Sequence, residues 1–279
     1  MTTDATAPAR VALPPVRDDQ GYYHLPGPDG GEQLLMSVST LIEHGVPKPG
    51  LVHWAAIEVA RCAIAHIPRL ARLRGETARE DAYQWLRRAA ERKRDEAADL
   101  GTLLHDHYEA RVLGAPTPKV GDLGRPFVAA FDRFLDEHRP EFHAAEMIIA
   151  NPDDGWAGKL DVAMQLPRLG PAVVVGDWKT GKKVYDEAAL QLSAYRRATV
   201  GWLRDGTEVK PVTTEAAVVV HIRPDVHEKT RGYRLYRVDT SDDVYASFLA
   251  ARDVASGWTR RRAKRAVTVL DLPPLSEAA

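Results

Sequence analysis

The sequence is poor in the residues that build disulfide frameworks and membrane spans. A single cysteine, Cys62, occurs among 279 residues, which excludes an internal disulfide and a four-cysteine iron–sulfur cluster. No apolar run approaches the roughly 20 residues of a membrane helix, and the polar N-terminus has no features of a signal peptide. We therefore expect a cytoplasmic protein with no membrane partner.

An excess of positive charge is also missing. The 38 Lys and Arg residues are balanced by 39 Asp and Glu residues, for a formal net charge of −1. The overall charge therefore gives no argument for a nucleic-acid partner, and affinity for DNA must come from local patches. The content of 44% hydrophobic and 28% charged residues is typical of a globular protein. At this length we expect one large domain or two small ones.

Chemically informative residues gather in the second half of the chain. The β-branched apolar run 172–175 is typical of a strand buried on both faces, and it leads into Asp177 and Lys179. Because strand side chains alternate, these two residues project to one face and Trp178 to the other. A second alternating segment carries Asp161 to the same place. The pattern predicts two carboxylates and an ammonium at one sheet edge.

This combination of charges is typical of a hydrolytic metal site. Neighbouring carboxylates repel each other, so one must be protonated or a cation must lie between them. Oxygen ligands favour Mg²⁺ or Mn²⁺, as one or two ions, and such an ion polarises a phosphoryl oxygen and activates a bound water. Lys179 would orient or deprotonate that water, or stabilise charge on the phosphate. The alternative is two surface aspartates and a lysine at strand ends, a common arrangement without function.

Two helical segments add polar residues. A helix predicted over 187–202 places Gln191 and Tyr195 one turn apart on one face, where an amide and a hydroxyl suit a phosphate or a terminal base. Taken singly, a packed tyrosine and a solvated glutamine are the simpler interpretation. Upstream, Gly101-Thr-Leu-Leu-His105 opens a helix predicted over 102–113. A lone histidine there is usually a core or surface residue, so its interpretation depends on the downstream motif.

Taken together, these segments resemble the RecB-like nucleases of the PD-(D/E)XK superfamily, which include phage-encoded and CRISPR-associated exonucleases. The matching pieces occur in the family's order over about residues 100 to 200: Gly101-x-x-x-His105, Asp161, Asp177-Trp-Lys179 and Gln191-x-x-x-Tyr195. The resemblance implies a metal held by His105, Asp161, Asp177 and the carbonyl of Trp178. It implies that Lys179 activates the water and that Gln191 and Tyr195 hold the strand or its terminal phosphate. Glu146 matches a glutamate of the relatives that would support the metal or the lysine.

The resemblance also implies a fold and a reaction. The fold is α/β, with a central mixed β-sheet flanked by helices, a restriction-endonuclease-like core and a helical N-terminal part. The reaction is Mg²⁺- or Mn²⁺-dependent hydrolysis of DNA in phage or bacterial recombination or repair. The resemblance favours an exonuclease over an endonuclease. A phage-encoded enzyme would act in the host cytosol, where an annealing protein is a conceivable partner. Many CRISPR-associated relatives carry an iron–sulfur cluster, and the single cysteine departs from that pattern. Digestion polarity, strand preference and oligomeric state stay open.

Two other classes of function stay open. The segment Gly176–Lys183 nearly fits the phosphate-binding loop of NTPases, but Lys183 stands where a hydroxyl should contact Mg²⁺. A non-catalytic DNA-binding module is the second alternative. Its contacts could come from the basic run 260–265, which is equally well interpreted as a solvated tail. Residues that border the proposed site are better candidates for DNA contacts: Lys182, Lys183, Arg196 and Arg197.

The remaining sequence predicts the order of elements. We expect a disordered tail over 1–20, a single nuclease domain over 21–265 and a C-terminal tail over 266–279. Within the domain, a helical part covers about 37–140 and the catalytic core about 141–240. Further helices are predicted over 37–43, 51–67, 76–98, 127–138 and 241–258. Strands are predicted over 22–25, 33–36, 141–149, 215–222 and 232–238.

Overall fold

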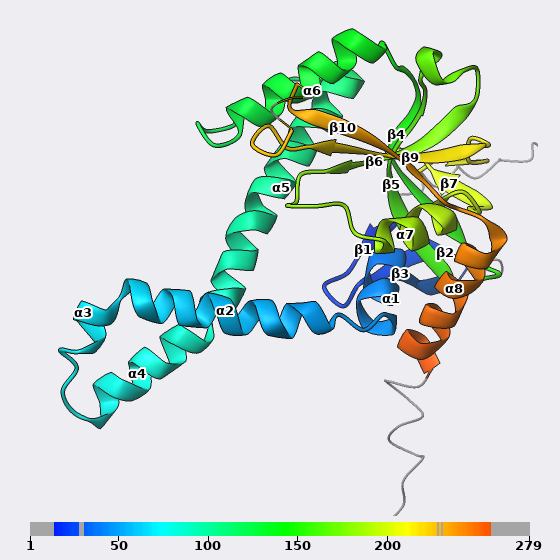
Figure 1. Cartoon of the computed structure of the whole chain (residues 1–279). Coiled ribbons are helices and arrows are strands. Elements are labelled where there is room, and N and C mark those ends of the chain that lie inside the picture. The colour runs from blue at the N-terminus through cyan, green and yellow to red at the C-terminus, as the bar shows by residue number, and fades with distance from the viewer. Residues whose placement is uncertain (1–13, 28–30, 228, 230, 258–279) are drawn as a thin grey trace, which may run out of the picture.

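The computed structural model describes residues 14–27, 31–227, 229 and 231–257. The fold is mixed α/β, with a curled mixed sheet flanked by helices (Figure 1), which confirms the predicted fold class. Within the described residues the strands are β1 (Val16–Arg17), β2 (Tyr22–Pro26), β3 (Glu32–Ser37), β4 (Glu141–Asn151), β5 (Trp156–Gln165), β6 (Val173–Lys179), β7 (Val200–Trp202), β8 (Glu208–Val209), β9 (Ala216–Ile222) and β10 (Tyr233–Val238). The helices are α1 (Val38–Gly45), α2 (Pro49–Ala65), α3 (Ile67–Leu70), α4 (Glu76–Arg87), α5 (Ala89–Leu113), α6 (Arg125–His138), α7 (Glu187–Tyr195) and α8 (Asp242–Asp253), with a 3-10 turn at Pro167–Leu169.

Strand β5 is the point at which the sheet divides. It pairs along its length with β4 in an antiparallel hairpin. On its other edge, Trp156 and Ala157 pair with β3, and residues 162–165 pair with β6. Strand β6 continues in parallel to β9, which pairs with β10, while β4 continues to β7 and β8. Residues 158–161 of β5 therefore lie where β3 and β6 separate.

Helices cover both faces of the sheet, and each face has its own core. One core packs α1, α7 and α8 against the sheet through residues such as Leu41, Leu192 and Phe248. The other core packs α5 and α6 around Trp178, whose ring lies 5.2 Å from that of Phe131. The place of Trp178 in this core confirms that its side chain points away from Asp177 and Lys179. Side chains of successive strand residues point to opposite faces.

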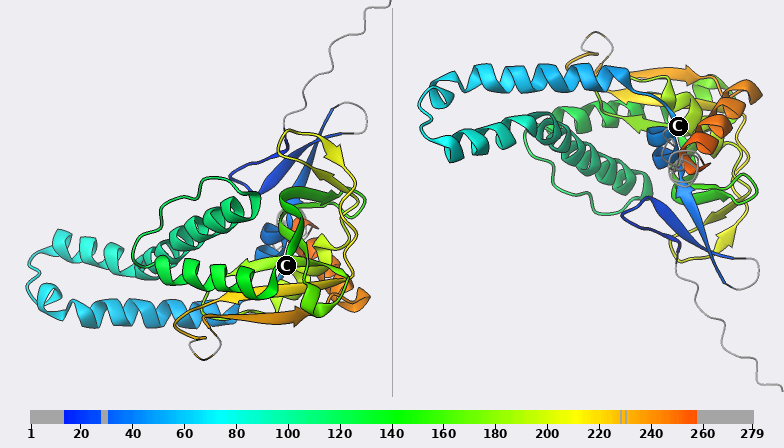
Figure 2. Two further views of the ribbon diagram at one scale, coloured as in Figure 1. Left: turned by 90° about the horizontal axis from the view of Figure 1, so that it is seen from above. Right: turned by 90° about the horizontal axis from the view of Figure 1, so that it is seen from below.

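A helical arm extends away from the sheet. We use this name for α2, α3, α4 and the first half of α5, residues 49–100, which project from the body of the molecule in all three ribbon views (Figures 1 and 2). No residue of α2, α3 or α4 is buried. Helix α5 then returns to the sheet, where Leu104 and Tyr108 are fully buried. The arm and the predicted site thus share one helix, which carries His105 beyond the arm.

The predicted disordered tail over 1–20 is wrong at its end. Val16 and Arg17 form β1, which pairs with β2. The Asp18 carboxylate accepts hydrogen bonds from the backbone N–H groups of Gln20 and Tyr22, at 2.9 and 2.8 Å, and so closes the turn between the two strands. An aspartate that bonds the backbone two residues on is a local turn former, so a segment without periodicity still folds. Residues 1–13 and 258–279, which include the basic run and the predicted C-terminal tail, lie outside the described residues.

The helices on either side of Arg88 differ from the predicted ones. The chain leaves helical geometry at Arg88, and α5 then runs unbroken through Gly101, where the predicted helices 76–98 and 102–113 are separate. At the break, the Arg92 guanidinium donates to the Trp85 carbonyl at 2.7 Å, which satisfies a group that the helix end would leave unpaired. Added bulk at Gly101 would meet only the Thr180 hydroxyl at 3.7 Å, so this glycine marks neither a bend nor a tight contact.

The predicted helix 187–202 is too long. Helix α7 ends at Tyr195, and residues 200–202 form β7, because the Thr199 N–H donates to the Ala150 carbonyl and starts pairing with β4. Tertiary pairing therefore overrides the helical periodicity. The remaining predicted elements are confirmed with shifts of a few residues at their ends, and α1 begins at the predicted cap, where Ser37 Oγ accepts from the Thr40 N–H at 3.2 Å. Helix α8 ends at Asp253 and continues as a π-helical turn over 254–257, and the predicted end at residue 258 lies outside the described residues.

Candidate active site

The candidate site lies where β5 and β6 separate. Their pairing ends at Val162 and Gly176, so the next residues of the two strands have no ladder bond to each other. The Trp178 N–H instead donates to Oδ2 of Asp161 at 3.0 Å. The Asp161 carboxylate thus accepts the hydrogen bond that a backbone carbonyl of β5 would accept if the two strands were still paired. This exchange brings the Asp161 carboxylate next to the residues that flank Trp178.

His105 reaches the same carboxylate from α5. Its Nδ1 atom lies 3.6 Å from Asp161 Oδ2, a distance longer than a hydrogen bond. The side chains of His105 and Asp161 are 31% and 14% exposed, so the pair is accessible from solvent. The buried neighbours Leu104 and Tyr108 hold this turn of α5 against the sheet. The structure therefore brings His105 and Asp161 together, as the sequence predicts.

Asp177 is the most deeply buried acid of the site. The residue is 2% exposed, and the Lys179 ammonium donates to its Oδ1 at 2.8 Å. Its Oδ2 lies 2.6 Å from the same ammonium as an ion-pair contact, yet it has no hydrogen bond within the described residues. Burial raises the pKa of Asp177 to about 6; the Lys179 charge opposes this shift and Asp161 reinforces it. Both oxygens of the Asp177 carboxylate thus lie within 2.8 Å of the Lys179 ammonium, and the Oδ2 atom is buried.

Lys179 connects the acids to α7. Burial lowers the pKa of Lys179, but the negative charges of Asp177 and Asp161 outweigh burial and raise it on balance. The ammonium also lies 3.4 Å from Gln191 Oε1, and the Gln191 amide donates to the Tyr195 hydroxyl at 3.3 Å. A charged Lys179 is suited to orient a water or to stabilise a phosphate. The raised pKa disfavours the neutral amine that could deprotonate a water.

Tyr195 is held against β5 by a close approach to a glycine. A Cβ atom added at Gly158 would lie 2.6 Å from a carbon of the Tyr195 ring, so only glycine leaves room for the ring. Burial raises the pKa of Tyr195 far above its usual range, and the hydroxyl stays neutral. Strand β5 thus contacts Tyr195 of α7 at Gly158 and carries the acid Asp161 three residues later. This explains why Gln191 and Tyr195 lie near the acids even though α7 is shorter than predicted.

Glu146 lies beside Asp161 in a strained backbone conformation. It falls between Ala145 and Met147, which pair with Val162 and Leu160, and so stands across from Asp161 in the hairpin. Its φ of 51° is unusual for a residue with a side chain. Glu146 forms an ion pair with Lys159; burial raises the pKa of Glu146, the Lys159 charge opposes this, and Asp161 adds to the rise. Such strain often occurs at functional sites.

The donor set suits a hard divalent cation. Carboxylates are the ligands that Mg²⁺ and Mn²⁺ prefer, and an imidazole is compatible with Mn²⁺. The buried Oδ2 of Asp177 already lies 2.6 Å from one cation, the Lys179 ammonium, so a metal ion there would share the carboxylate with it. Among the residues that the structure describes, no group of three or more His, Cys, Asp or Glu side chains is placed so that it could hold a metal ion. In this arrangement the ammonium of Lys179 balances the charge of Asp177.

Several predicted site residues lie elsewhere. The Arg196 guanidinium donates to Thr240 Oγ1 and the Thr214 carbonyl, and Arg197 donates to Asp242 and to the Ser193 carbonyl. Both arginines therefore tie α7 to the loops beside β9 and α8, so a contact with DNA would compete with these bonds. Their role in DNA contact stays a prediction. Lys182 and Lys183 are exposed on the segment after β6 and keep their place as candidates for DNA contacts.

The geometry of a phosphate-binding loop is not found. Gly176 to Lys179, which would start the loop, are extended in β6 and pair with β9. The helix that should begin at the motif lysine starts only at Glu187. A phosphate-binding loop needs its backbone N–H groups to converge at a helix N-terminus, and an extended strand cannot provide them.

One residue near the site is not among the predicted site residues. His221 on β9 pairs with Lys179 in the sheet, and its Nε2 donates to the Gly181 carbonyl at 2.8 Å. Its Nδ1 lies 2.9 Å from Nε2 of His227. The two histidines thus hold the segment that follows Lys179. The signal for His221 was present, since it is the first polar residue after the apolar run 216–220.

Comparisons with known proteins add no family. No protein-family model matches the sequence, and a search of curated proteins returns no match. Among the helices within the described residues, none combines the length and the apolar composition that crossing a bilayer requires. The functional argument therefore depends on the site itself.

Proposed function

We propose that the protein is a divalent-metal-dependent deoxyribonuclease that hydrolyses phosphodiester bonds and acts mainly as an exonuclease. The observation that carries the proposal is the cluster around Asp177: a carboxylate that is 2% exposed, lies with both oxygens beside the Lys179 ammonium, and has its pKa raised further by the charge of Asp161. A buried ion pair beside a second carboxylate is costly for stability, and a ligand role explains why it is kept. The resemblance of the motif order to RecB-like nucleases supports DNA as the substrate, in phage or bacterial recombination or repair.

The residues divide the work of hydrolysis among them. Asp161, Asp177 and His105 would hold Mg²⁺ or Mn²⁺, which when bound supplies a polarised phosphoryl oxygen and a water of lowered pKa. Lys179, kept charged by the two acids, would orient that water and stabilise the charge that grows on the phosphate. Gln191 and Tyr195 present a neutral amide and hydroxyl beside Lys179. These groups would position the strand without adding repulsion to its phosphates.

A cleavage assay separates this proposal from the alternatives. Single- and double-stranded DNA, labelled at the 5′ or the 3′ end, is incubated with the protein and Mn²⁺ or Mg²⁺, with EDTA as a control. We expect wild type to release short labelled products in the presence of metal, and Asp177→Ala to release none. Equal cleavage by the two proteins removes the proposed site. DNA binding without cleavage under every condition favours the non-catalytic DNA-binding module.

A further inference from the structure

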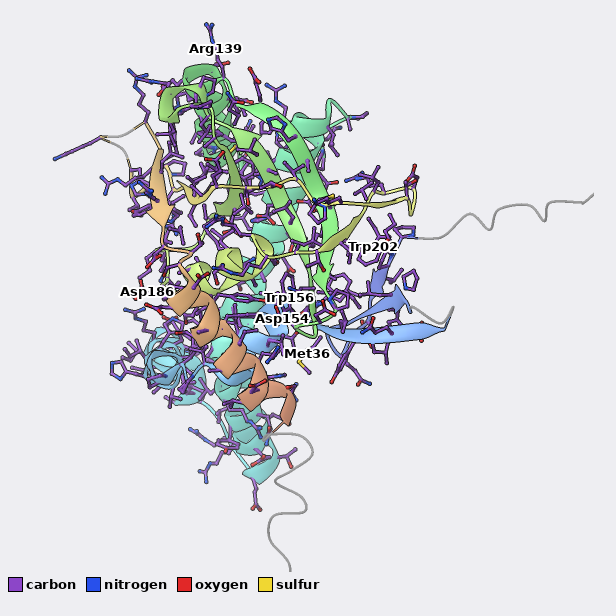
Figure 3. All side chains as sticks on the ribbon, turned by 90° about the vertical axis from the view of Figure 1, so that its right-hand side faces the viewer. Met36, Arg139, Asp154, Trp156, Asp186 and Trp202 are labelled. Carbon is purple, nitrogen blue, oxygen red and sulfur yellow. The ribbon has the colours of Figure 1, made fainter. Side chains whose placement is uncertain are left out.

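A cavity of about 370 Å³ lies between the N-terminal strands and the β4–β7 edge of the sheet. We call it the β1–β7 pocket. Strands β1, β2, β4, β5 and β7 and the residues next to β1 and β7 form its wall, and in Figure 3 Trp202 lies on the side of the molecule where the N-terminal strands lie. The residues that matter for its chemistry are Arg17, Tyr23, Glu146, Lys159, Trp202 and Arg204. Its volume falls in the range of about 300–1,000 Å³ that is usual for small-ligand sites.

The pocket adjoins the candidate active site. Glu146 lines it and stands across from Asp161 in the β4–β5 hairpin. Lys159 lines it as well, two residues before Asp161 on the same strand. The pKa of Glu146 responds to Lys159 and to Asp161, so the two sites share one electrostatic environment. A chain-like ligand at Asp161 would reach the pocket by passing Glu146.

The charges of the pocket favour an anion. Lys159 contacts Glu146, and Arg204 contacts Glu109 of α5. Arg17 donates to the Thr40 hydroxyl at 3.1 Å and forms no ion pair with any described residue. The charge of Arg17 is thus available to a ligand. Lys159 and Arg204, whose side chains are at least half-exposed, add positive charge to the pocket wall. A phosphate would gain a charge-assisted hydrogen bond from the Arg17 guanidinium.

The pocket also has an apolar, aromatic part. Tyr23 and Trp202 are 5% and 4% exposed and belong to one buried cluster with Leu25 and Leu35. With so little exposed surface, the two rings offer a nucleobase apolar edge contacts at the pocket wall and no open face for stacking. A cation next to an aromatic wall matches the two halves of a nucleotide, namely a phosphate and a flat base.

We propose that the β1–β7 pocket holds one unstacked nucleotide unit of the DNA strand, with its phosphate at Arg17 and its base against Tyr23 and Trp202. This inference rests on the proposed nuclease function, since the strand would reach the pocket from the scissile phosphate near Asp161. The pocket would fix how far the strand extends beyond the point of cleavage. It adds a substrate subsite on the N-terminal strands, which the sequence motifs do not cover.

Binding can be measured without cleavage. The protein is labelled with 5-fluorotryptophan, the Trp202 resonance is assigned with Trp202→Phe, and thymidine monophosphate is added in EDTA. We expect a saturable ¹⁹F shift at Trp202 in wild type and loss of that shift in Arg17→Glu and in the milder Arg17→Gln. Arg237→Glu, an exposed arginine on the distant strand β10, is the matched control and should shift as wild type does. Binding of a fluorescent oligothymidylate, also in EDTA, should weaken about tenfold in Arg17→Glu, with a salt slope lower by about 0.7.

The outcomes separate the pocket from the nuclease. A wild-type protein that cleaves DNA but shows no Trp202 shift overturns the pocket and leaves the nuclease standing. A Trp202 shift in a protein that never cleaves DNA supports the nucleotide site and refutes the proposed function. If inorganic phosphate gives the same shift with the same affinity as thymidine monophosphate, the base is not recognised and the nucleotide proposal fails. Loss of the shift in Arg237→Glu as well would also refute it, because the effect would then be one of general charge.

Discussion

The helical arm and the sheet hold their charged residues in opposite ways. On the arm no charged residue is buried, and Lys93 and Glu96, an i,i+3 ion pair, are 62% and 68% exposed. In the sheet, Asp177 and Glu146 are 2% and 9% exposed, and each has a lysine beside it. Exposed charges cost little and contribute little, whereas a buried carboxylate costs several kcal/mol before it is paired. The difference teaches that the charges of the sheet need an explanation beyond stability, and those of the arm do not.

The largest expected effect concerns Lys179. Lys179→Ala should lower the rate of DNA cleavage by at least about 100-fold, because it removes the charge that faces the reacting phosphate. DNA binding, measured by fluorescence anisotropy in EDTA, should stay within a few-fold of wild type. Lys93→Ala on the arm is the matched control and should cleave at the wild-type rate. A fully active Lys179→Ala would refute the role of this residue and erase the contrast between the two regions.

The next effect concerns stability. Trp178→Ala should destabilise the protein by about 3–5 kcal/mol, because its indole is fully buried among Tyr108, Phe131 and Phe134. Trp85→Ala on the arm should cost well under half as much. Its indole is partly exposed and packs on His66 and two arginine side chains. Urea denaturation followed by circular dichroism measures both. Equal losses would mean that the arm is as tightly packed as the sheet.

A smaller effect concerns pH. Folding raises the pKa of Asp177 to about 6, so the folded protein binds this proton more tightly than the unfolded chain does. The stabilisation from the proton is complete below the unfolded pKa near 4 and is lost as the pH rises through about 6. In EDTA, the free energy of unfolding of wild type should therefore fall relative to that of Asp177→Asn between pH 4 and pH 7. Above pH 7 the difference between the two proteins should stay constant. Thermal melts across this range measure it, and parallel curves for the two proteins would contradict the raised pKa.

The smallest effect belongs to the surface of the arm. Glu96→Gln, which breaks the ion pair with Lys93, should change the free energy of unfolding by no more than about 0.5 kcal/mol, and less at high salt. Glu146→Gln is the counterpart in the sheet, since it leaves the half-exposed Lys159 without its buried partner. Urea denaturation at low and high salt compares the two variants. A cost for Glu96→Gln as large as that for Glu146→Gln would show that exposure does not decide the value of these pairs.

Local patterns explain why much of the fold could be predicted. The β2–β3 hairpin, the capped helix α1 and the amphipathic helix α6 each carry their signal within a few residues. The end of α7 could not be read locally, because pairing of residue 199 with Ala150 of β4 decides it. The break at Arg88 also depends on tertiary context, since Ala89 and Ala90, which follow it, are both buried.

The candidate site shows the same division. Alternation along β6 predicts that Asp177 and Lys179 share a face, and the structure brings them together with Asp161, His105 and Gln191. The positive φ of Glu146 and the separation of β5 from β6 have no sequence signature, because they depend on how three strands meet. The inward bonds of Arg196 and Arg197 were missed for a related reason. An arginine next to a site looks the same in sequence whether it faces a ligand or a carbonyl oxygen.

The most direct test is whether Asp177 binds a divalent ion. Isothermal titration of Mn²⁺ at pH 7.5 into wild type and into Asp177→Asn compares a carboxylate with an amide of the same shape. We predict saturable binding to wild type and a loss of at least about tenfold in affinity in Asp177→Asn, together with loss of Mn²⁺-dependent DNA cleavage. Identical Mn²⁺ isotherms for the two proteins would contradict the claim that this buried acid is a metal ligand.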